Sequence, residues 1–267
     1  MRRAITIAGS DSGGGAGIQA DLKTFSAFGV YGLSALTAIT AQNTLGVQGV
    51  QVLSPEFVVL QIRSVLSDIG ADAGKTGMLA TKQIVAAVAR EVGAFRLRSL
   101  VVDPVMVSAT GHRLLDEDAV EAVRTLLIPL ATVVTPNLDE ATILWGEKIE
   151  DLDGMKEAAR AIKALGPRFV LVKGGHLAGP RVFDVLYDGK GFEVRDAPKI
   201  PTENTHGSGC TLSAAIAAGL AKGCAVKEAV LVAQRYIHAA IKGAVKIGKG
   251  KGPVNHLVKV RGLRSEG

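Results

Sequence analysis

A short glycine-containing segment just before a predicted helix of small residues has the residue types for anion binding and for acid–base catalysis. It reads Asn204-Thr205-His206-Gly207-Ser208-Gly209-Cys210-Thr211 and leads into the uncharged segment 212–218. Two glycines two positions apart let a backbone approach an anion closely, and the first turn of a helix carries unpaired N–H groups at the positive end of its dipole. The run therefore predicts a phosphate-binding turn whose donors are the amides of Gly207, Ser208, Gly209 and Cys210.

The thiol of Cys210 would lie on the first turn of that helix. The pKa of a free cysteine thiol is about 8.5, and a helix N-terminus lowers it. We therefore expect a thiolate that could act as a base. The alternative is a small apolar cysteine in a glycine-containing loop before a packed helix, and this segment alone leaves both interpretations open.

Length and composition favour one large α/β domain. The 267 residues are 48% hydrophobic, which is ample for a core, and we expect a single domain over residues 1–267. The net charge is +6, but residues 246–267 hold six basic residues and one acidic residue. We expect this segment to be a solvated basic tail, with neither nucleic acid nor a membrane as its partner.

The cysteines and the N-terminus exclude several other classes of protein. Cys210 and Cys224 form no Cys-x-x-Cys pair and no metal-ligand spacing, so neither a disulfide framework nor a zinc site is indicated. The first residues become polar too early for a signal peptide, and polar residues interrupt the uncharged stretch 24–55 before it could span a membrane. A cytoplasmic protein is the expectation.

Strands and helices alternate along the chain, which predicts a mostly parallel sheet with helices on both faces. Polar and glycine clusters follow the strands, and ligands bind beyond the carboxyl ends of strands in such sheets. Residues 15–20 match a dinucleotide-binding fingerprint, but no acidic residue lies between Asp21 and Glu56 to hold a ribose, which excludes a nicotinamide or flavin site. Strands are expected at 3–8, 31–40, 49–53, 73–76, 99–102, 131–135, 168–173, 181–187 and 191–195, and helices at 16–28, 54–68, 81–92, 116–127, 136–145, 151–165, from 210 and 226–246.

Taken together, six motifs resemble the hydroxymethylpyrimidine/phosphomethylpyrimidine kinases of thiamin biosynthesis, in the ribokinase-like fold. The resemblance covers residues from about 4 to 256 and depends on the order and spacing of the motifs. They are Ala8-Gly-Ser-Asp-Ser-Gly-Gly-Gly-Ala-Gly-Ile-Gln-Ala-Asp21, Thr40-Ala-Gln-Asn-Thr44, Val102-Asp-Pro-Val-Met106, Thr135-Pro-Asn-Leu-Asp-Glu140, Lys173-Gly-Gly-His176 and the Cys210 run.

The resemblance implies an α/β three-layer sandwich and an ATP- and Mg²⁺-dependent kinase. Its substrate would be 4-amino-5-hydroxymethyl-2-methylpyrimidine and then the monophosphate, giving the diphosphate. We also expect a homodimer. Most ribokinase-like enzymes carry an Asp base where this sequence has Cys210, and a positioned thiolate could equally accept the hydroxyl proton.

On the pyrimidine side the resemblance carries over Gly9, Asp21, Gln42 and Met78. A carboxylate accepts and an amide both donates and accepts, which suits an amino group and ring nitrogens. Without the resemblance, Asp21 would be a solvated carboxylate in the first turn of a helix, and Gln42 a satisfied polar group at a strand end.

On the nucleotide side Asp103 and Glu140 are implied as Mg²⁺ ligands, because magnesium keeps several waters and needs few carboxylates. The implied phosphate contacts are Asn137, Lys173, Thr205 and Lys249. The alternatives are a strand-end turn at Asp103, a plain helix start with an N-cap and an acid three residues on at Asn137 and Glu140, and a flexible basic tail at Lys249. Structural roles are expected for His176 and His206.

Two other functions stay open. A pyridoxal kinase of the same fold would act on a hydroxymethylated heterocycle of similar outline, although Asp21 and Gln42 favour the aminopyrimidine. A pyrimidine- or nucleotide-binding regulator without catalysis is the second alternative, and the intact Cys210 run with the acidic residues argues against it.

Overall fold

The structure is a computed structural model that describes residues 1–106, 115, 117–175, 177, 179–260 and 262. The expected helix start at Asp116 and the expected structural role of His176 lie outside these residues.

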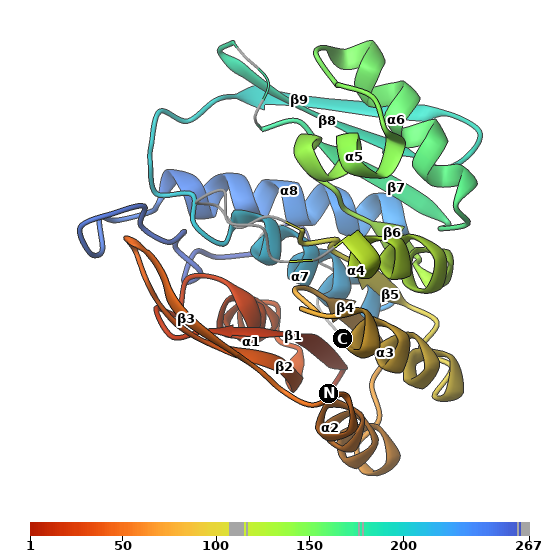
Figure 1. Cartoon of the computed structure of the whole chain (residues 1–267). Coiled ribbons are helices and arrows are strands. Elements are labelled where there is room, and N and C mark those ends of the chain that lie inside the picture. The colour runs from red at the N-terminus through yellow and green to blue at the C-terminus, as the bar shows by residue number, and fades with distance from the viewer. Residues whose placement is uncertain (107–114, 116, 176, 178, 261, 263–267) are drawn as a thin grey trace.

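One nine-stranded sheet forms the centre of the molecule, in the order β3-β2-β1-β4-β5-β6-β7-β8-β9 (Figure 1). Pairing is parallel from β2 through β7 and antiparallel only for β2 with β3 and within the β7-β8-β9 meander. The predicted mostly parallel α/β sheet is therefore confirmed. The strands are β1 (Arg3–Asp11), β2 (Tyr31–Asn43), β3 (Gly46–Val52), β4 (Ala73–Thr76), β5 (Leu100–Val102), β6 (Val133–Val134), β7 (Phe169–Lys173), β8 (Arg181–Tyr187) and β9 (Phe192–Pro198).

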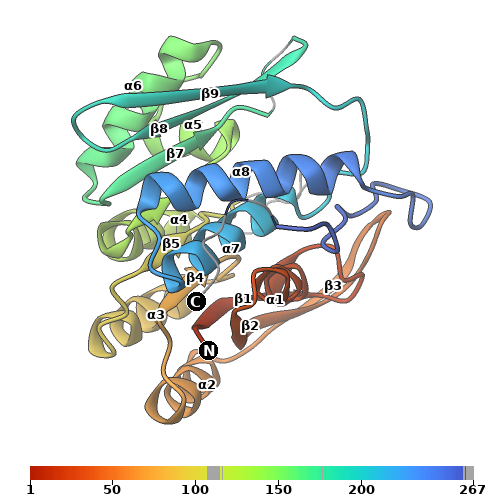
Figure 2. The same cartoon turned by 180° about the vertical axis from the view of Figure 1, so that it is seen from behind.

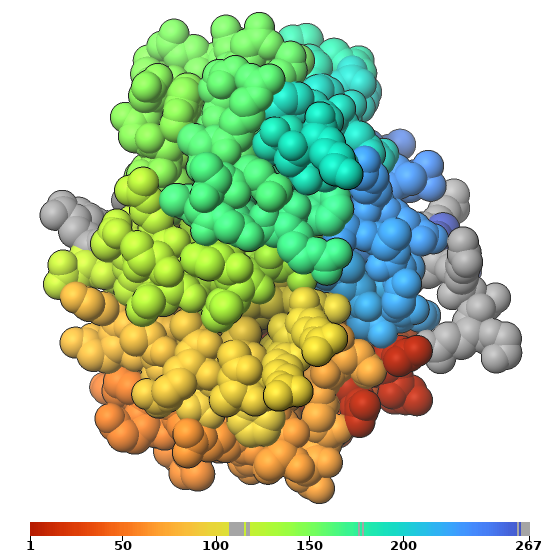
Figure 3. Space-filling model, turned by 90° about the vertical axis from the view of Figure 1, so that its right-hand side faces the viewer, coloured from red at the N-terminus to blue at the C-terminus, as the bar shows by residue number. Residues whose placement is uncertain are grey.

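Helices cover both faces of the sheet, each with its own hydrophobic core. One face carries α1 (Gly17–Ala27), α7 (Ser208–Ala221) and α8 (Val226–Lys242), which lie together in Figures 1 and 2. The other face carries α2 (Pro55–Asp68), α3 (Lys82–Ala94), α4 (Glu117–Ala122), α5 (Leu138–Trp145) and α6 (Leu152–Ala164), with a π turn at Val123–Leu127 and a 3-10 turn at Ile128–Leu130. Figure 3 shows the orange-to-green segments of this layer stacked in chain order.

The helix starts follow the capping residues in the sequence. The Ser54 hydroxyl accepts from the Phe57 amide with Pro55 at the first helical position, and the Thr81 hydroxyl accepts from the Ile84 amide. The elements differ from prediction mainly at their ends. The strands expected at 31–40 and 49–53 extend toward each other as one hairpin, β2-β3, and the helix expected to reach residue 246 ends at Lys242.

The expected solvated basic tail is wrong over residues 252–258, which we call the C-terminal strap. Pro253 makes an isolated β-bridge with His206, and Val254 and His256 are buried. The Tyr236 hydroxyl of α8 donates to the His256 carbonyl at 2.8 Å. His256 lies in the turn that follows, and its Nε2 is 2.9 Å from the hydroxyl oxygen of Thr211 on α7. The strap therefore fastens the chain end to α8 and to the loop before α7.

No helix in the described ranges is both long and apolar enough to cross a membrane.

The buried ring of His256 predicts a loss of stability in acid. Burial, and secondarily the charge of Lys23, lowers its pKa from 6.5 to about 4. Because the unfolded chain takes up the proton first, stability falls as the pH drops from about 6.5 toward 4, by roughly 2–3 kcal/mol from this residue. Urea unfolding at pH 7 and pH 4.5 should therefore show a smaller acid loss for His256→Gln than for the parent. His238→Gln on α8 is the control and should follow the parent; equal acid losses in all three proteins would contradict the assignment.

Candidate active site

Two loops meet at the carboxyl edge of the sheet, one after β1 and one after β9. Gly207, the N-cap of α7, has φ of 76°, and a Cβ placed there would lie 1.8 Å from the carbonyl oxygen of Gly15. Only glycine permits this approach and this conformation without strain. The contact joins the chain just before α1 to the start of α7, and these two helices lie close together in both ribbon views (Figures 1 and 2).

The carboxylate of Asp11 organises the first loop and joins it to the second. It accepts from the amides of Gly13, Gly15 and Ala16 at 2.8, 3.0 and 2.8 Å, and its Oδ2 lies 2.8 Å from His206 Nε2. Burial alone would raise the pKa of Asp11, but the His206 contact and these amides hold it below its ordinary value. An ionised carboxylate only accepts, so the His206 ring nitrogen carries the proton here. His206 has the expected structural role of linking the loops.

The first turn of α7 offers fewer amides than the sequence predicts. The Ser208 amide donates to the Thr205 carbonyl at 3.1 Å, which closes the turn and occupies that donor. Over the described ranges the amides of Gly207, Gly209 and Cys210 donate to no other backbone group. Gly209 and Cys210 lie on the first turn, at the positive end of a 14-residue helix, and are the helical donors left for an anion, with the N-cap amide of Gly207 just ahead of them.

Cys210 is half-buried as a residue, and its thiol is protonated at neutral pH. Burial, with the nearby carboxylates of Asp21 and Asp103, raises its pKa to about 11, while Lys75 and the Gly17 amide act in the opposite direction. The predicted lowering of this pKa is therefore wrong. The free energy lost when the thiolate is removed from water exceeds the stabilisation that the helix N-terminus gives to its charge.

Two buried lysine–aspartate pairs flank the thiol. Lys75 Nζ lies 3.0 and 2.8 Å from the oxygens of Asp21, and both side chains have no exposed surface. Lys173 Nζ lies 3.0 Å from Asp103 Oδ1, and these side chains are 14% and 2% exposed. A Cβ on Gly209 would lie 3.3 Å from Lys173 Nζ, so this second pair directly adjoins the first turn of α7.

The ion pair of Lys75 and Asp21 differs most from what the sequence predicted. Asp21 also accepts from the Thr6 hydroxyl at 2.6 Å, so its oxygens are used internally. It is neither the solvated carboxylate of the plain reading nor an open acceptor for a pyrimidine. Sequence reasoning did not single out Lys75, although a lysine within the four-residue buried strand Ala73–Thr76 was the available signal.

Asp103 and Glu140 lie on either side of Lys173. Asp103 also accepts from the hydroxyls of Thr135 and Ser213 at 3.2 and 3.1 Å, and burial, which would raise its pKa, is outweighed by Lys173 and Lys75. Burial and the charge of Asp103 raise the pKa of Glu140 to about 7, against the effect of Lys173. The three side chains form one electrostatic cluster.

Asn137 and Glu140 also form the capping box at the start of α5, as the structural alternative predicted. The Asn137 side chain accepts from the Glu140 amide at 2.9 Å, and the Glu140 carboxylate accepts from the Asn137 amide at 2.8 Å. An isolated bridge between Asn137 and Lys173 places this capping box at the end of β7. Among the described residues no three His, Cys, Asp or Glu side chains are grouped to hold a metal ion.

The remaining predicted residues lie around the two loops. A Cβ on Gly9 would lie 2.5 Å from Met78 Cε, so these two are neighbours, and Gln42 Nε2 lies 3.4 Å from His206 Nε2. Thr205 is exposed and gives its carbonyl to the turn. Lys249 is exposed in a loop whose Gly250 amide donates to Thr44 at 3.1 Å, close to the end of β2.

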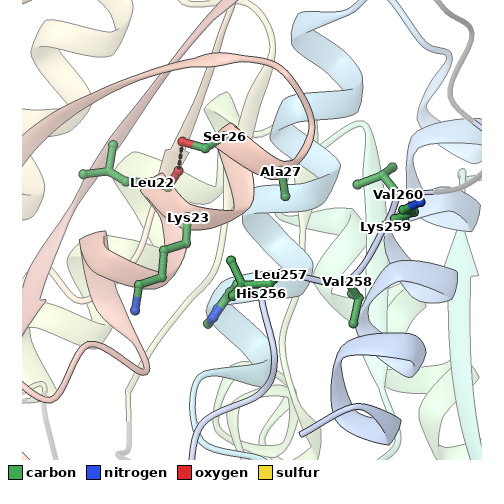
Figure 4. Close-up of a pocket in the computed structure, with 9 residues that line it drawn as sticks. All are labelled: Leu22, Lys23, Ser26, Ala27, His256, Leu257, Val258, Lys259 and Val260. Atoms are coloured by element: carbon green, nitrogen blue, oxygen red, sulfur yellow. Dashed lines mark hydrogen bonds between the residues drawn. The ribbon is translucent and has the colours of Figure 1, made fainter.

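A separate groove of about 790 Å³ lies between α1 and the C-terminal strap (Figure 4). Its wall includes Leu22, Lys23 and Val258, and none of the predicted site residues lines it. The site is therefore defined by the converging loops and not by this groove.

The mostly parallel sheet with helices on both faces is the ribokinase-like fold, which the chain shares with solved small-molecule kinases. The profile of the family described as phosphomethylpyrimidine kinase matches residues 11–255. The chain belongs to this family.

Individual relatives agree with that placement. A hydroxymethylpyrimidine/phosphomethylpyrimidine kinase from Streptomyces coelicolor is 52% identical over 94% of this chain and 93% of its own length. A thiamine biosynthesis bifunctional protein from Geobacter sulfurreducens is 50% identical over 97% of this chain, which spans only 53% of that protein. The solved ADP complex of Bacillus subtilis pyridoxal kinase superposes with a TM-score of 0.89 at 44% identity, covering 96% of this chain and 97% of that one.

The contact between Gly207 and Gly15 predicts a large cost for any side chain at residue 207. Gly207→Ala forces a Cβ against the Gly15 carbonyl and strains a positive φ, and we expect a loss of about 2–4 kcal/mol in the free energy of unfolding. Gly223→Ala is the matched control, because Gly223 also has a positive φ of 83° but would meet nothing within 4 Å. Denaturant unfolding should show about 1 kcal/mol for the control; similar losses in both variants would show that the loop contact is unimportant.

Proposed function

We propose that the protein transfers the γ-phosphoryl group of ATP to the hydroxymethyl oxygen of 4-amino-5-hydroxymethyl-2-methylpyrimidine, and then to the resulting monophosphate. The observation that carries this is the pair of available amides at Gly209 and Cys210, with Lys173 beside them and the β1 loop facing them. Family membership and the activity for which the Streptomyces relative is named support the substrate. The nucleotide in the Bacillus complex supports ATP as the donor.

The transferred phosphoryl group would lie on the first turn of α7. The Gly209 and Cys210 amides would stabilise its charge, Gly207 and Ser208 would shape the turn, and Lys173 would contribute a positive charge from the side. Asn137, Thr205 and Lys249 are proposed to contact the nucleotide phosphates.

Asp103 and Glu140 are proposed to hold Mg²⁺ through water. Their oxygens already accept hydrogen bonds from protein groups, which leaves them suited to water-mediated contact, and magnesium retains several waters in proteins. The ion would neutralise charge on the phosphates when bound. A pKa of about 7 for Glu140 without metal means that a cation would favour its ionised form.

The pyrimidine is proposed to lie against Gly9, Met78 and Gln42. A half-buried amide at residue 42 has both a donor and an acceptor to offer to an amino group and a ring nitrogen. Asp21 has no exposed surface, so it would not touch the pyrimidine and would influence this site only through its ion pair with Lys75.

A mass-spectrometric product assay tests this function. Purified protein with the hydroxymethylpyrimidine, ATP and Mg²⁺ should give the monophosphate and then the diphosphate. No product with this substrate would reject the proposal. Pyridoxal is the second candidate because of the Bacillus structure, and a higher kcat/KM for pyridoxal would replace the first assignment by that one.

Cys210→Ala should slow the first transfer more than the second. A neutral alcohol must lose a proton during the first transfer, whereas the acceptor phosphate of the second is already ionised near pH 7. General-base loss costs about 10²–10⁴-fold, so we expect a loss of that size only in the first single-turnover rate. Cys224→Ala is the control and should change neither rate; equal losses in both transfers of Cys210→Ala would indicate positioning instead of proton transfer.

We also propose that a single domain over residues 1–267 acts as a homodimer in the cytoplasm, where ATP is plentiful. Edge strand β3 and the start of α2 expose Val50, Val52, Phe57 and Leu60, which follow one another in the chain. An uncovered edge strand beside apolar side chains is a surface that proteins usually cover.

Light scattering coupled to size exclusion tests the dimer. The parent should have twice the chain mass, and the double variant Phe57→Glu/Leu60→Glu should be monomeric. Glu substitution of the exposed Leu257 on the strap is the control and should leave the mass unchanged. A monomeric parent, or a double variant that stays dimeric, would contradict this interface.

A further inference from the structure

Lys75 is a charged residue that cannot contact a ligand in this structure. Its side chain and that of Asp21 are both 0% exposed, and the pair is closed by the Thr6 hydroxyl. Replacement of such a pair by apolar residues is often neutral or stabilising, so stability alone does not explain a lysine at this depth. Its effect on the site has to pass through its neighbours.

The strand and the helix direct Lys75 toward the side of the sheet that α7 covers. Ala73 and Lys75 are two apart on β4 and face the same side of the sheet, and Ala73 belongs to the core on the α7 side. Gly17 and Asp21 are four apart on α1 and share one face of that helix. The Gly17 amide donates to the Cys210 sulfur and Asp21 holds Lys75, so one face of α1 connects the lysine to the thiol.

Four charged residues near the sulfur come from four elements: Asp21 from α1, Lys75 from β4, Asp103 from the end of β5 and Lys173 from the end of β7. Glu140 of α5 in turn acts on Lys173. Cys210 is among the charges that act on Lys75, and Lys75 is the strongest charge that favours the ionised sulfur. The two carboxylates oppose it.

We propose that Lys75, held in place by Asp21, is a positioning residue that stabilises the thiolate form of Cys210. The thiol first loses its own proton to water, which gives the thiolate. In the first transfer the hydroxyl proton then passes to this thiolate, and the oxygen electron pair forms the bond to the γ-phosphorus. The bond from that phosphorus to the β,γ-bridging oxygen breaks, and its electrons leave with ADP. The chemical role rests on the proposed function, but the effect on the thiol does not.

The alkylation rate of Cys210 by iodoacetamide, measured by peptide mass spectrometry from pH 7 to 9.5, tests the proposal without any substrate. Only the thiolate reacts, so the rate changes tenfold for each unit of thiol pKa in this range. In Lys75→Met the favourable charge is lost, and we expect Cys210 to react about three- to tenfold more slowly than in the parent. In Asp21→Asn an opposing charge is lost, and we expect Cys210 to react at least as fast as in the parent.

Opposite directions in the two variants separate an electrostatic role from a structural one. Arg63→Met is the matched control, because it breaks an ion pair with Glu91 at 2.7 Å on α2 and α3; it should leave the Cys210 rate unchanged. If Lys75→Met does not fold, Asp21→Asn/Lys75→Met is compared with Asp21→Asn, and the double variant should react more slowly. A parental or faster rate on loss of the lysine, or the same shift in both single variants, would overturn the proposal.

The outcome is independent of the product assay. A failed assay with the expected alkylation rates would reject the substrate and keep the electrostatic role, whereas the reverse result would keep the kinase and reject the role of Lys75.

Discussion

Gly207 packs against the Gly15 carbonyl with no room for a side chain, and the rest of the site depends on this contact. It brings two helix N-termini together at one sheet edge, so that the Gly17 amide of α1 reaches the sulfur at the start of α7. Asp11 and His206 fix the same junction with polar contacts, and the strap adds the bridge of Pro253 to His206. A loop-to-loop junction held from several sides is suited to keep donors aligned before a substrate arrives.

The second constraint is the electrostatic cost of the buried charges. Each lysine of the site neutralises one aspartate at hydrogen-bond distance, and hydroxyls of Thr6, Thr135 and Ser213 satisfy the remaining carboxylate positions. Burial of an ion is tolerated when it is paired and hydrogen-bonded. The site thus combines a protonated thiol, two ion pairs and a glutamic acid that titrates near pH 7, which is a poised arrangement for receiving an anionic nucleotide with its cation.

Much of this arrangement could be predicted from the sequence because it depends on local rules. Alternating strands and helices give the parallel sheet, caps such as Ser54 and Thr81 fix helix starts, and loops at the carboxyl ends of parallel strands must converge. That argument correctly brought together the Gly9–Gly17 loop, Asp103, Asn137, Lys173 and the Cys210 run. The family also followed from the order of the same motifs.

The features that were missed depend on distant parts of the chain. The partner of Asp21 is 54 residues away, and burial of that pair follows from the packing of α7 over β4. The sign of the Cys210 pKa is decided by desolvation, which a helix-end argument does not include. Charge composition suggested a free tail, whereas burial of Val254 and His256 and the contacts of His256 with α7 and α8 hold the strap in place.

The central claim is that the amides of Gly209 and Cys210 receive the transferred phosphoryl group. Amide NMR of the ¹⁵N-labelled protein, titrated with ADP, Mg²⁺ and aluminium fluoride as a mimic of the phosphoryl in transfer, tests it most directly. We expect the largest shifts at these two amides, with smaller ones at Gly207 and Lys173. Saturable binding that leaves the Gly209 and Cys210 signals unmoved would contradict it.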